Sequence, residues 1–448
     1  MSVRDLATDH LVEADARHLL HPLHNAAHKP RILVRGQGAV MWDADGHQYI
    51  DGLSGLWNVN VGHGRAELAA AAQEQMSMLA FCSSYTGQAN RPAIELAERL
   101  AALAYPKLNA TFFTSGGAES NESAFKTARY YWKRKGRPDK VKIISRQHGY
   151  HGVTLAAMSA TGLPNYHTMF GPLVPGFVQT AAPYTYRHPD VDAAAELEKT
   201  IQAEGPGTVA AFIAEPVQGA GGVIVPPDDY FGRVREICDR HGVLFIADEV
   251  ITGFGRTGET FALARWGVQP DIMSFAKGIT SGYVPLGGIM LSDDVAETIR
   301  TARGPESWMH AYTYSGHPTA CAVGLANLDV IARERLVERA AETGAYLQNK
   351  VEELESLPNV DGARGLGMMA AIEIVQDKAT RQGFPAEKNV SARALALAAE
   401  RGLITRQRHY GAGESIMLAP PLVTTREQID RIAEILAESI TLAVKEVA

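Results

Sequence analysis

Through the middle of this 448-residue chain, short runs that are almost wholly apolar alternate with longer helical patterns. The run VLFIA at residues 243–247 is apolar at every position, which is typical of a strand buried on both faces of a parallel sheet. The stretches between such runs, among them residues 118–135 and 229–241, have helical periodicity. The alternation predicts an α/β fold whose helices cover both faces of a mainly parallel sheet. The predicted strands are residues 110–114, 141–145, 208–214, 243–247, 271–275 and 287–291.

The two ends of the chain differ from the middle. Residues 31–50 alternate like a β meander, with Asp45-Gly46 as the signal for a hairpin turn. After about residue 325, long amphipathic helical patterns alternate with short strands, including residues 368–374 and 415–418. We predict that the two ends combine into a small domain beside a large one. The predicted parts are residues 1–59 and 326–448 for the small domain and residues 60–325 for the large domain.

Composition excludes several classes of protein. The chain has 43 Lys and Arg against 50 Asp and Glu, a formal charge of −7, which does not suit a nucleic-acid-binding surface. No stretch approaches the ~18 uninterrupted apolar residues of a membrane span, and the first residues lack the pattern of a secretory signal. The three scattered cysteines are too few for a disulfide framework or a zinc site. We therefore expect a soluble, cytoplasmic protein.

One glycine-rich loop follows a predicted strand and opens a predicted helix, at residues 114–121 (TSGGAESN). Open α/β sheets bind ligands at such strand ends. Gly116 and Gly117 let the backbone approach an anion closely, and the free N–H groups of a helix start favour a phosphate. An ordinary strand-to-helix turn explains this loop equally well.

A second loop, QHGYHG at residues 147–152, follows the strand predicted at 141–145. Tyr150 in this loop could stack on a flat aromatic ligand. His148 and His151 have no Asp, Glu or Cys beside them in the sequence, so we interpret them as hydrogen-bonding or structural residues. No metal site is predicted.

A carboxylate stands at the end of the most apolar strand, where Asp248 follows VLFIA. A buried carboxylate needs a partner, so Asp248 either caps the next loop or holds a cationic group of a ligand. The sequence G-F-G-R-T-G at residues 253–258 has the spacing of a dinucleotide-binding loop. We reject that interpretation, because Asp248 and Glu249 stand between the strand and the glycines and would repel a pyrophosphate.

Lys277 leaves another apolar strand, within SFAKG. Lysine is seldom buried without a partner, and partial burial would lower its pKa and make it a usable nucleophile. A surface lysine is the commoner explanation for any single lysine of this kind.

Taken together, these stretches resemble the class III aminotransferases, which are pyridoxal-phosphate enzymes of fold type I. Lys277 follows Asp248 by 29 residues, with the glycine-rich helix start upstream. The resemblance extends over most of the chain, and it is closest to the pyruvate-dependent ω-amine, taurine, β-alanine and polyamine transaminases. The strings that carry it are DGLSGLWNVNVGHGR, SGGAESNE, YHG, AEPVQGAGG, IADEVITGFGRTG, SFAKGITSGYVPLGG, HAYTYSGHPTACA and LAPPLV.

The resemblance implies a fold and a set of cofactor contacts. The fold is a large domain with a mainly parallel seven-stranded sheet and a smaller α+β domain built from both termini. Lys277 would form a Schiff base with pyridoxal phosphate and carry the proton, and Asp248 would pair with the pyridine nitrogen. Relatives often have Ser where this chain has Gly117, so backbone N–H groups would carry more of the phosphate grip. The other implied cofactor-binding residues are Ser115, Gly116, Gly117, Tyr150, His151, Glu215 and Val250.

The resemblance also implies a shared active site. In the family, the residue at the position of Thr313 reaches the phosphate from the neighbouring subunit. We therefore expect a homodimer, which could pair further into a tetramer. A plain loop before a helix starting near Pro318 is the alternative for this segment.

Substrate contacts are implied at both ends of the chain. Trp57 and Tyr85 match aromatic wall positions, although an aromatic residue there could also belong to the core. Leu23 stands where relatives often have an aromatic residue, which would leave a roomier pocket. Arg406 is the best match to the mobile arginine that pairs with the carboxylate of the 2-oxo acid, with Arg408 as the alternative.

The predicted function is ping-pong transamination from a primary amine or ω-amino acid to pyruvate or another 2-oxo acid. An aminomutase or decarboxylase of the same fold is the first alternative. A non-catalytic protein that binds pyridoxal phosphate is the second, and the presence of both Lys277 and Asp248 argues against it. The physiological amine is not predicted.

Overall fold

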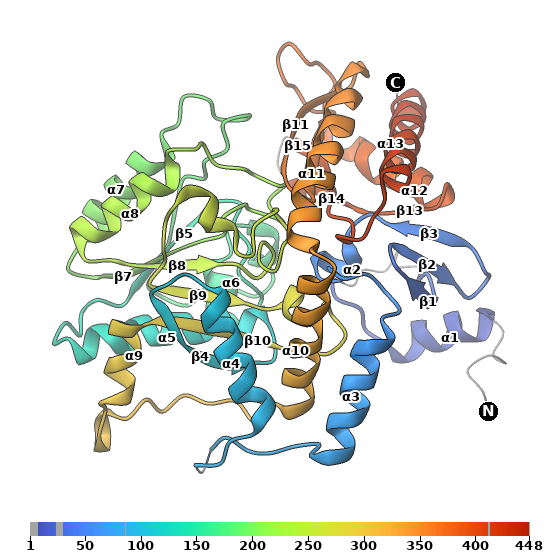
Figure 1. Cartoon of the computed structure of the whole chain (residues 1–448). Helices are drawn as coiled ribbons and strands as arrows, with labels where there is room; N and C mark the ends of the chain where they lie inside the picture. Colours follow the sequence, from blue (N-terminus) through green and yellow to red (C-terminus); the bar gives the residue numbers. More distant parts are fainter. Residues whose placement is uncertain (1–7, 24–29, 86, 411–412, 448) are drawn as a thin grey trace.

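The computed structural model describes residues 8–23, 30–85, 87–410 and 413–447. Its largest element is a seven-stranded sheet in the part of the chain predicted to be the large domain (Figure 1). The strands are β4 (Leu108–Thr114), β5 (Lys142–Arg146), β6 (Phe177–Thr180), β7 (Val209–Ala214), β8 (Leu244–Asp248), β9 (Ile272–Phe275) and β10 (Gly287–Ser292).

The order of this sheet is β4-β10-β9-β8-β7-β5-β6. β10 is antiparallel to both of its neighbours, and the other neighbouring pairs are parallel. The mainly parallel sheet is thus confirmed, and the six predicted strands are present within two residues at each end. The seventh, β6, is a partly buried edge strand of sequence FVQT, and it lacks the apolar run that marks the others.

Helices cover both faces of the sheet because its strands are apolar on both sides. In β7, Ala211 and Ile213 pack on one face, whereas Phe212 and Ala214 pack on the other. The first face is covered by α5 (Gly117–Arg134), α6 (Leu155–Ala160) and α9 (Asp293–Arg300). The second face is covered by α4 (Arg91–Leu103), α7 (Ala193–Glu204) and α8 (Tyr230–His241), with α10 (Pro318–Arg333) packed on α4. The helices predicted over 118–135 and 229–241 correspond to α5 and α8.

The N-terminal meander forms a second sheet together with a strand from the C-terminal part. Its hairpin turn is held by Asp43, whose Oδ1 accepts hydrogen bonds from the backbone N–H groups of Asp45 (3.1 Å) and His47 (2.8 Å). Gly46 in this turn has φ +87°, which suits glycine, so the predicted turn is confirmed. The strands are β1 (Leu33–Gln37), β2 (Val40–Asp43), β3 (Gln48–Asp51) and β13 (Leu403–Ile404), in that order.

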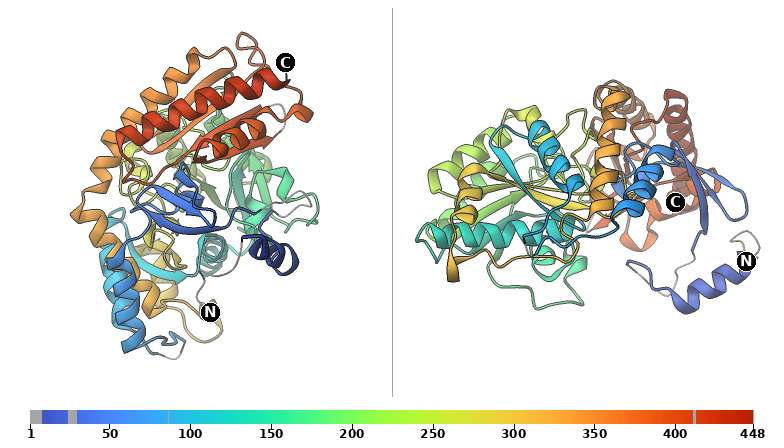
Figure 2. Two further views of the ribbon diagram at one scale, coloured as in Figure 1. Left: turned by 90° about the vertical axis from the view of Figure 1, so that its right-hand side faces the viewer. Right: turned by 60° about the horizontal axis from the view of Figure 1, so that its bottom comes forward.

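Because β3 and β13 pair in parallel, the two ends of the chain share one sheet. Figure 2 shows the blue N-terminal strands beside the red C-terminal elements. The boundaries at residues 59 and 325 remain predictions.

The third sheet has the order β11 (Val360–Leu366), β12 (Met369–Ile374), β15 (Gly413–Leu418) and β14 (Arg406–Tyr410). The remaining helices are α1 (Thr8–His18), α2 (Ser54–Trp57), α3 (Ala66–Met78), α11 (Leu336–Glu353), α12 (Val390–Glu400) and α13 (Arg426–Val447). In the described part of the chain, every helix is too short or too polar to cross a membrane.

Candidate active site

The predicted cofactor residues gather at one edge of the large sheet. Asp248 is the last residue of β8, and Lys277 follows the neighbouring parallel strand β9. β4, β5 and β7 run in the same direction, so the loops after them reach the same edge. The sheet topology therefore brings together five loops that lie far apart in the sequence, at the place where open α/β sheets bind ligands.

Asp248 is buried and accepts hydrogen bonds on both carboxylate oxygens. Its Oδ2 lies 2.8 Å from Nδ2 of Asn121 and 2.7 Å from Nδ1 of His151. Its Oδ1 accepts only the backbone N–H of Val250, at 3.1 Å, among the residues that the structure describes. Because an ionised carboxylate can only accept hydrogen bonds, Nδ1 of His151 carries the proton. The carboxylate is thus oriented from one side and retains acceptor capacity on Oδ1.

Asn121 and Ser274 belong to this network, although the sequence analysis did not select them. Oδ1 of Asn121 accepts a hydrogen bond from Oγ of Ser274 at 2.7 Å, and its Nδ2 also donates to the carbonyl oxygen of His151 at 2.8 Å. Ser274 lies within β9, and Asn121 lies on α5. The sequence offered one signal for Asn121: it is a polar residue among the apolar-face positions of a predicted helix, and a polar group buried there needs a hydrogen-bond partner.

Glu215 lies after β7 and forms a second buried carboxylate. Its two oxygens accept the backbone N–H groups of Tyr150 and Gly219, each at 2.9 Å. Burial raises the pKa of Glu215, the charge of His151 opposes that rise, and Asp248 adds to it. Folding thus brings Asp248 and Glu215 near His151, where the sequence shows no carboxylate. Within the described residues, Nε2 of His151 is buried and has no hydrogen-bond partner.

Lys277 belongs to this cluster and has an unusual backbone conformation. Its φ of +49° places a non-glycine residue in the left-handed region, a strained conformation of the kind that concentrates at functional sites. Burial lowers its pKa from 10.5 to about 8, even though the charges of Asp248 and Glu215 oppose that shift. Arg406 and Arg256 act in the same direction as burial. Near pH 8 a large fraction of this amine is therefore neutral and able to react or accept a proton.

The glycine-rich loop after β4 has one open and one crowded glycine. A Cβ on Gly116 would meet no atom within 4 Å, whereas a Cβ on Gly117 would lie 2.8 Å from Cγ1 of Val250. Gly117 is the first residue of α5, and the backbone N–H of Ser115 is held by Oε2 of Glu119 at 2.8 Å. The open side of Gly116 at a helix N-terminus suits a phosphate. Gly117 is required by the close approach of Val250.

The two candidate arginines have different surroundings. Arg408 is buried, donates to the carbonyl oxygen of Gly221 and lies 5.3 Å from the ring centroid of Tyr184. Arg406 is half-buried at the start of β14, and its side chain makes no hydrogen bond or ion pair with the residues that the structure describes. Burial raises the pKa of Tyr150 to about 12, and the positive charge of Arg406 opposes that rise. Burial lowers the pKa of Lys277, and the same charge adds to that shift, so Arg406 acts on the site.

Four predicted residues lie outside this cluster. Trp57 is 2% exposed and packs among apolar side chains that include Leu53 and Val217, so its ring lies in a core cluster. Leu23 and Tyr85 are 64% and 61% exposed on the chain. Thr313 is also exposed. Oγ of Ser84 donates to the carbonyl oxygen of Ser315 at 3.2 Å, so the loops that carry Tyr85 and Thr313 are neighbours.

The G-F-G-R-T-G loop has a structural role in this fold. Arg256 is fully buried, and its guanidinium donates to Oγ of Ser54 (2.9 Å), to Oδ1 of Asn60 (2.8 Å) and to the carbonyl oxygens of Met368 and Pro420 (3.3 and 2.5 Å). The loop therefore connects the large sheet to both ends of the chain.

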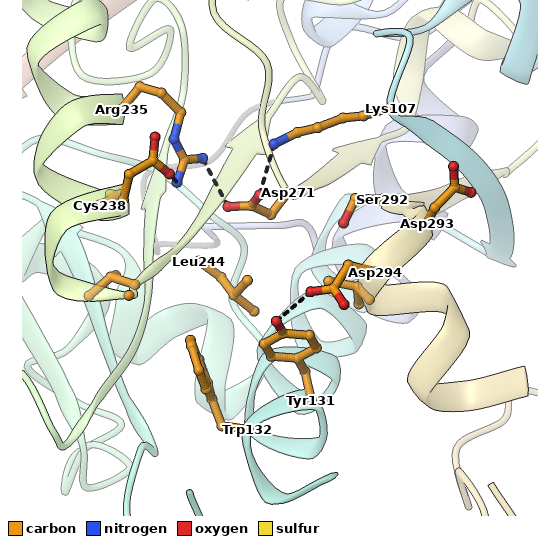
Figure 3. A pocket seen from close by; sticks show the side chains of 14 residues that line it. Lys107, Tyr131, Trp132, Arg235, Cys238, Leu244, Asp271, Ser292, Asp293 and Asp294 are labelled. Carbon is orange, nitrogen blue, oxygen red and sulfur yellow. Dashed lines mark hydrogen bonds and ion pairs between the residues drawn. The ribbon is translucent and has the colours of Figure 1, made fainter. Parts of the chain in front are cut away.

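A pocket of about 340 Å³ lies at the opposite edge of the sheet, near the amino ends of β8 and β9 (Figure 3). Its charged groups are already paired. Asp271 accepts from Lys107 at 2.8 Å and from Arg235 at 2.9 Å, and Asp294 accepts from the hydroxyl of Tyr131 at 2.5 Å. Because ligands of open α/β sheets bind at the carboxyl ends of the strands, we do not assign the active site to this pocket.

Comparison with known proteins agrees with the geometry. The model of the class III aminotransferase family matches residues 23–440. Putrescine–pyruvate aminotransferase of Pseudomonas aeruginosa is 44% identical over 424 residues, which cover 93% of this chain and 90% of that protein. The structure of an (S)-enantioselective ω-transaminase from Thermomicrobium roseum is 50% identical, with a TM-score of 0.94 and coverage of 98% and 99% of the two chains. An amine transaminase from an uncultivated Pseudomonas species, solved in its pyridoxal-phosphate-bound form, is 41% identical, with a TM-score of 0.91 and coverage of 95% and 99%.

The chain belongs to the class III aminotransferases. It is a transaminase, and the cofactor of the family is pyridoxal phosphate. The residues present fit that cofactor. A buried carboxylate with a free acceptor position, Asp248, suits a protonated ring nitrogen, and the open side of Gly116 suits a phosphate. The fold class predicted from the sequence is confirmed.

Proposed function

We propose that this transaminase moves an amino group from a primary amine or ω-amino acid to pyruvate or another 2-oxo acid in a ping-pong reaction. The two substrates share a site, and only the acceptor has a carboxylate beside the reacting carbon. Arg406 carries the proposal, because this cation acts on Lys277 and has no partner in the described part of the chain. An uncommitted guanidinium suits a substrate carboxylate that is present in only one half-reaction.

In the proposed mechanism, five residues position the cofactor, some of them through another residue. Asp248 keeps a positive charge on the ring nitrogen, and Asn121 and His151 hold the carboxylate in position. Bound pyridoxal phosphate supplies an electron sink for the charge that develops when a proton leaves the substrate carbon. Glu215 fixes the backbone of Tyr150 through its N–H group, so that the Tyr150 ring can cover one face of the cofactor.

Contacts to the phosphate and to the second ring face come from the loop after β4 and from Val250. We propose that the backbone N–H groups of Gly116 and Gly117 bind the phosphate at the start of α5, beside Ser115, whose own N–H is held by Glu119. Val250 packs on Gly117, which places its methyl groups beside this loop and leaves them available to the ring.

Lys277 is proposed to move the proton. Its Nζ, with a pKa of about 8, can accept a proton from the substrate carbon near neutral pH and return it at another position. A base whose pKa lies near the working pH balances the two transfers. The negative charges of Asp248 and Glu215 favour the protonated form of the amine.

We propose that residues from the N-terminal part of the chain form the walls of the substrate pocket. Leu23 and Tyr85 would line the substrate pocket, where the aliphatic side chain of Leu23 would leave more space for larger amines than an aromatic ring. The ring of Trp57, which is buried in a core cluster, would support this wall from behind. The name of the Pseudomonas aeruginosa relative supports a diamine donor and pyruvate as acceptor. A panel of amines, described below, identifies the physiological donor.

A homodimer is proposed to complete the phosphate site with Thr313 of a second copy. Thr313 is exposed on the chain, and three exposed apolar residues accompany its segment: Tyr314 (58%), Met309 (89%) and Phe81 (43%). The rings of Phe81 and Tyr314 are 6.3 Å apart. Exposed apolar groups of this kind mark interaction surfaces.

A cytoplasmic location is proposed from the low cysteine content alone.

The proposed function is tested with Arg406→Ala and single half-reactions. We expect the rate with pyruvate to fall by about 10- to 100-fold, the loss expected for one charge-assisted contact, whereas the rate with an amine without a carboxylate changes less than about twofold. Arg401→Ala is the matched control, because Arg401 pairs with Glu438 at the surface, at 3.3 Å. Equal losses in both half-reactions would contradict the role of Arg406.

The donor is identified with the cofactor-loaded protein and putrescine, β-alanine, taurine and 1-phenylethylamine, each added without an acceptor. The change in the visible absorbance of the cofactor reports the first half-reaction. Pyruvate added afterwards should restore the starting spectrum. If 2-oxoglutarate restores it and pyruvate does not, the pyruvate part of the proposal is wrong.

A further inference from the structure

The sheet that carries Arg406 contains a buried carboxylate with no role in the proposed mechanism. Glu373 on β12 is fully buried. Its Oε1 accepts from Nη2 of Arg364 at 2.7 Å, and its Oε2 accepts from Nη2 of Arg187 at 2.7 Å. The hydroxyl of Tyr184 also donates to Oε1. Burying a charged carboxylate costs free energy, so we looked for a function of Glu373 beyond packing.

The register of the sheet places Glu373 on the same face as the two arginines of β14. Glu373 on β12 lies opposite Ser415 on β15, and Ser415 lies opposite Arg408 on β14. Residues directly opposite each other in an antiparallel sheet point to the same face. Arg406 is two residues from Arg408, so its side chain starts from that face as well.

Arg408 and Glu373 interact through their opposite charges. Burial would raise the pKa of Glu373, but the charges of Arg364, Arg408 and Arg187 hold it below its usual value, so the carboxylate is ionised at neutral pH. The Tyr184 ring contacts two of these cations, with its centroid 5.2 Å from Arg364 and 5.3 Å from Arg408. Removal of the negative charge would leave buried guanidinium groups without their counter-ion.

The same cluster holds the loop after β7. Nε of Arg364 donates to the carbonyl oxygen of Gly222 at 2.9 Å, and Arg408 donates to that of Gly221. The turn that contains these glycines begins at Gly219, whose N–H group binds Glu215. The cluster therefore connects β14 to the loop that fixes Tyr150 through Glu215.

We propose that Glu373 is a positioning residue for the acceptor carboxylate: it holds Arg408 and the Gly219–Gly222 turn in place, so that β14 presents Arg406 to the substrate at a fixed position. Glu373 does not touch the substrate. Arg408 is buried and bound to the carbonyl oxygen of Gly221, which leaves Arg406 as the arginine that can move. The inference rests on the proposed role of Arg406.

The test compares Glu373→Gln, which keeps the shape and removes the charge, with the unchanged protein in both half-reactions. We expect the KM for pyruvate to rise by about tenfold, while the rate with an amine that lacks a carboxylate changes less than about twofold. The affinity of the cofactor-loaded protein for butyrate, a carboxylate that cannot react, should fall by the same factor in calorimetry. A loss that is equal in both half-reactions would overturn the proposal, because a purely structural defect affects both.

Glu414→Gln is the matched control. Glu414 is a buried carboxylate on the neighbouring strand β15, one residue from Ser415 and therefore on the other face, where it accepts the backbone N–H of Ser391 at 2.5 Å. Its substitution should leave the ratio of the two half-reactions unchanged. If it shifts that ratio as much as Glu373→Gln does, the effect belongs to the sheet as a whole and the proposal is wrong.

One further variant keeps the test decisive. Tyr184→Phe removes only the hydroxyl that donates to Glu373, and we expect a selective rise in the KM for pyruvate of about threefold. If Glu373→Gln does not fold, an unchanged ratio in Tyr184→Phe overturns the proposal. Failure of the proposed function is separate: Arg406→Ala without a selective loss refutes the role of Arg406, whereas a selective Arg406→Ala with a non-selective Glu373→Gln refutes only the role of Glu373.

Discussion

The side-chain amide of Asn121 donates a hydrogen bond of 2.8 Å to Oδ2 of Asp248, across 127 positions of the sequence. The amide cannot turn freely, because its oxygen accepts from Oγ of Ser274 at 2.7 Å. Asn121 therefore joins α5, β8 and β9 at the point where the cofactor ring nitrogen is proposed to bind. The orientation of Asp248 depends on a helix residue as well as on its own strand.

Substitution of Asn121 should weaken cofactor binding. Asn121→Leu has a similar volume and removes the donor to Asp248, so we expect the dissociation constant for pyridoxal phosphate to rise by about tenfold, the effect of one buried hydrogen bond to a charged group. Titration of the cofactor-free protein by absorbance measures it. Ser274→Ala is the control, since it removes a bond one step further away, and its effect should be smaller. A larger effect of Ser274→Ala would show that the amide is not the decisive contact.

The reactivity of Lys277 should follow its lowered pKa. The amine is charged below its pKa and neutral above it, and only the neutral form attacks the cofactor aldehyde. With a pKa of about 8, the rate of covalent loading of the cofactor-free protein should rise as the pH increases towards 8 and level off above it. Stopped-flow absorbance between pH 6 and about 10 measures this rate. A rate that continues to rise towards 10.5 would contradict the lowered pKa, and Lys277→Ala should show no loading at all.

The crowded and the open glycine of the phosphate loop should respond in opposite ways. In Gly117→Ser, the new Cβ would stand 2.8 Å from Cγ1 of Val250, so we expect the cofactor-free protein to lose about 1–3 kcal/mol of unfolding free energy. Val250→Ala in the same chain should recover much of that loss. Urea unfolding measures both.

Gly116→Ala is the matched change in the neighbouring residue. Its Cβ would meet no protein atom within 4 Å, so the unfolding free energy should stay within about 0.5 kcal/mol. The same Cβ would stand in the space proposed for the phosphate, and the affinity for pyridoxal phosphate should therefore fall. Unchanged affinity would place the phosphate elsewhere.

Arg256 should matter for stability more than any surface arginine. Arg256→Met leaves the carbonyl oxygen of Pro420 and the side chains of Ser54 and Asn60 without their donor, so we expect a loss of about 3–5 kcal/mol of unfolding free energy. Arg265→Met is the control, because Arg265 is exposed and lies 3.7 Å from Asp228. Its effect should stay within about 0.5 kcal/mol. Equal effects would mean that the buried contacts of Arg256 contribute little.

Much of the large sheet could be predicted from local sequence. Runs such as those that form β7 and β8 are apolar at every position, since both of their faces are covered by helices, and this pattern is visible without any partner. β6 was not predicted, because an edge strand is buried on one side and its sequence FVQT carries no such run. The short parallel pairing of β3 with β13 could not be located either, since the sequence contains no mark of which strands become neighbours.

The same distinction applies to the site. Lys277, Asp248 and the glycines could be selected because each ends or follows an apolar strand, and local sequence shows where strands end. His151 showed no carboxylate nearby in the sequence, yet its Nδ1 lies 2.7 Å from Asp248, because β5 and β8 run parallel on either side of β7 and their loops meet. The resemblance selected Arg406 ahead of Arg408, but the burial of Arg408 and the partial exposure of Arg406 could not be predicted, since they depend on what packs over β14. Local patterning is sufficient for elements that bury both faces, whereas charge partners and burial depend on contacts between segments that are distant in the chain.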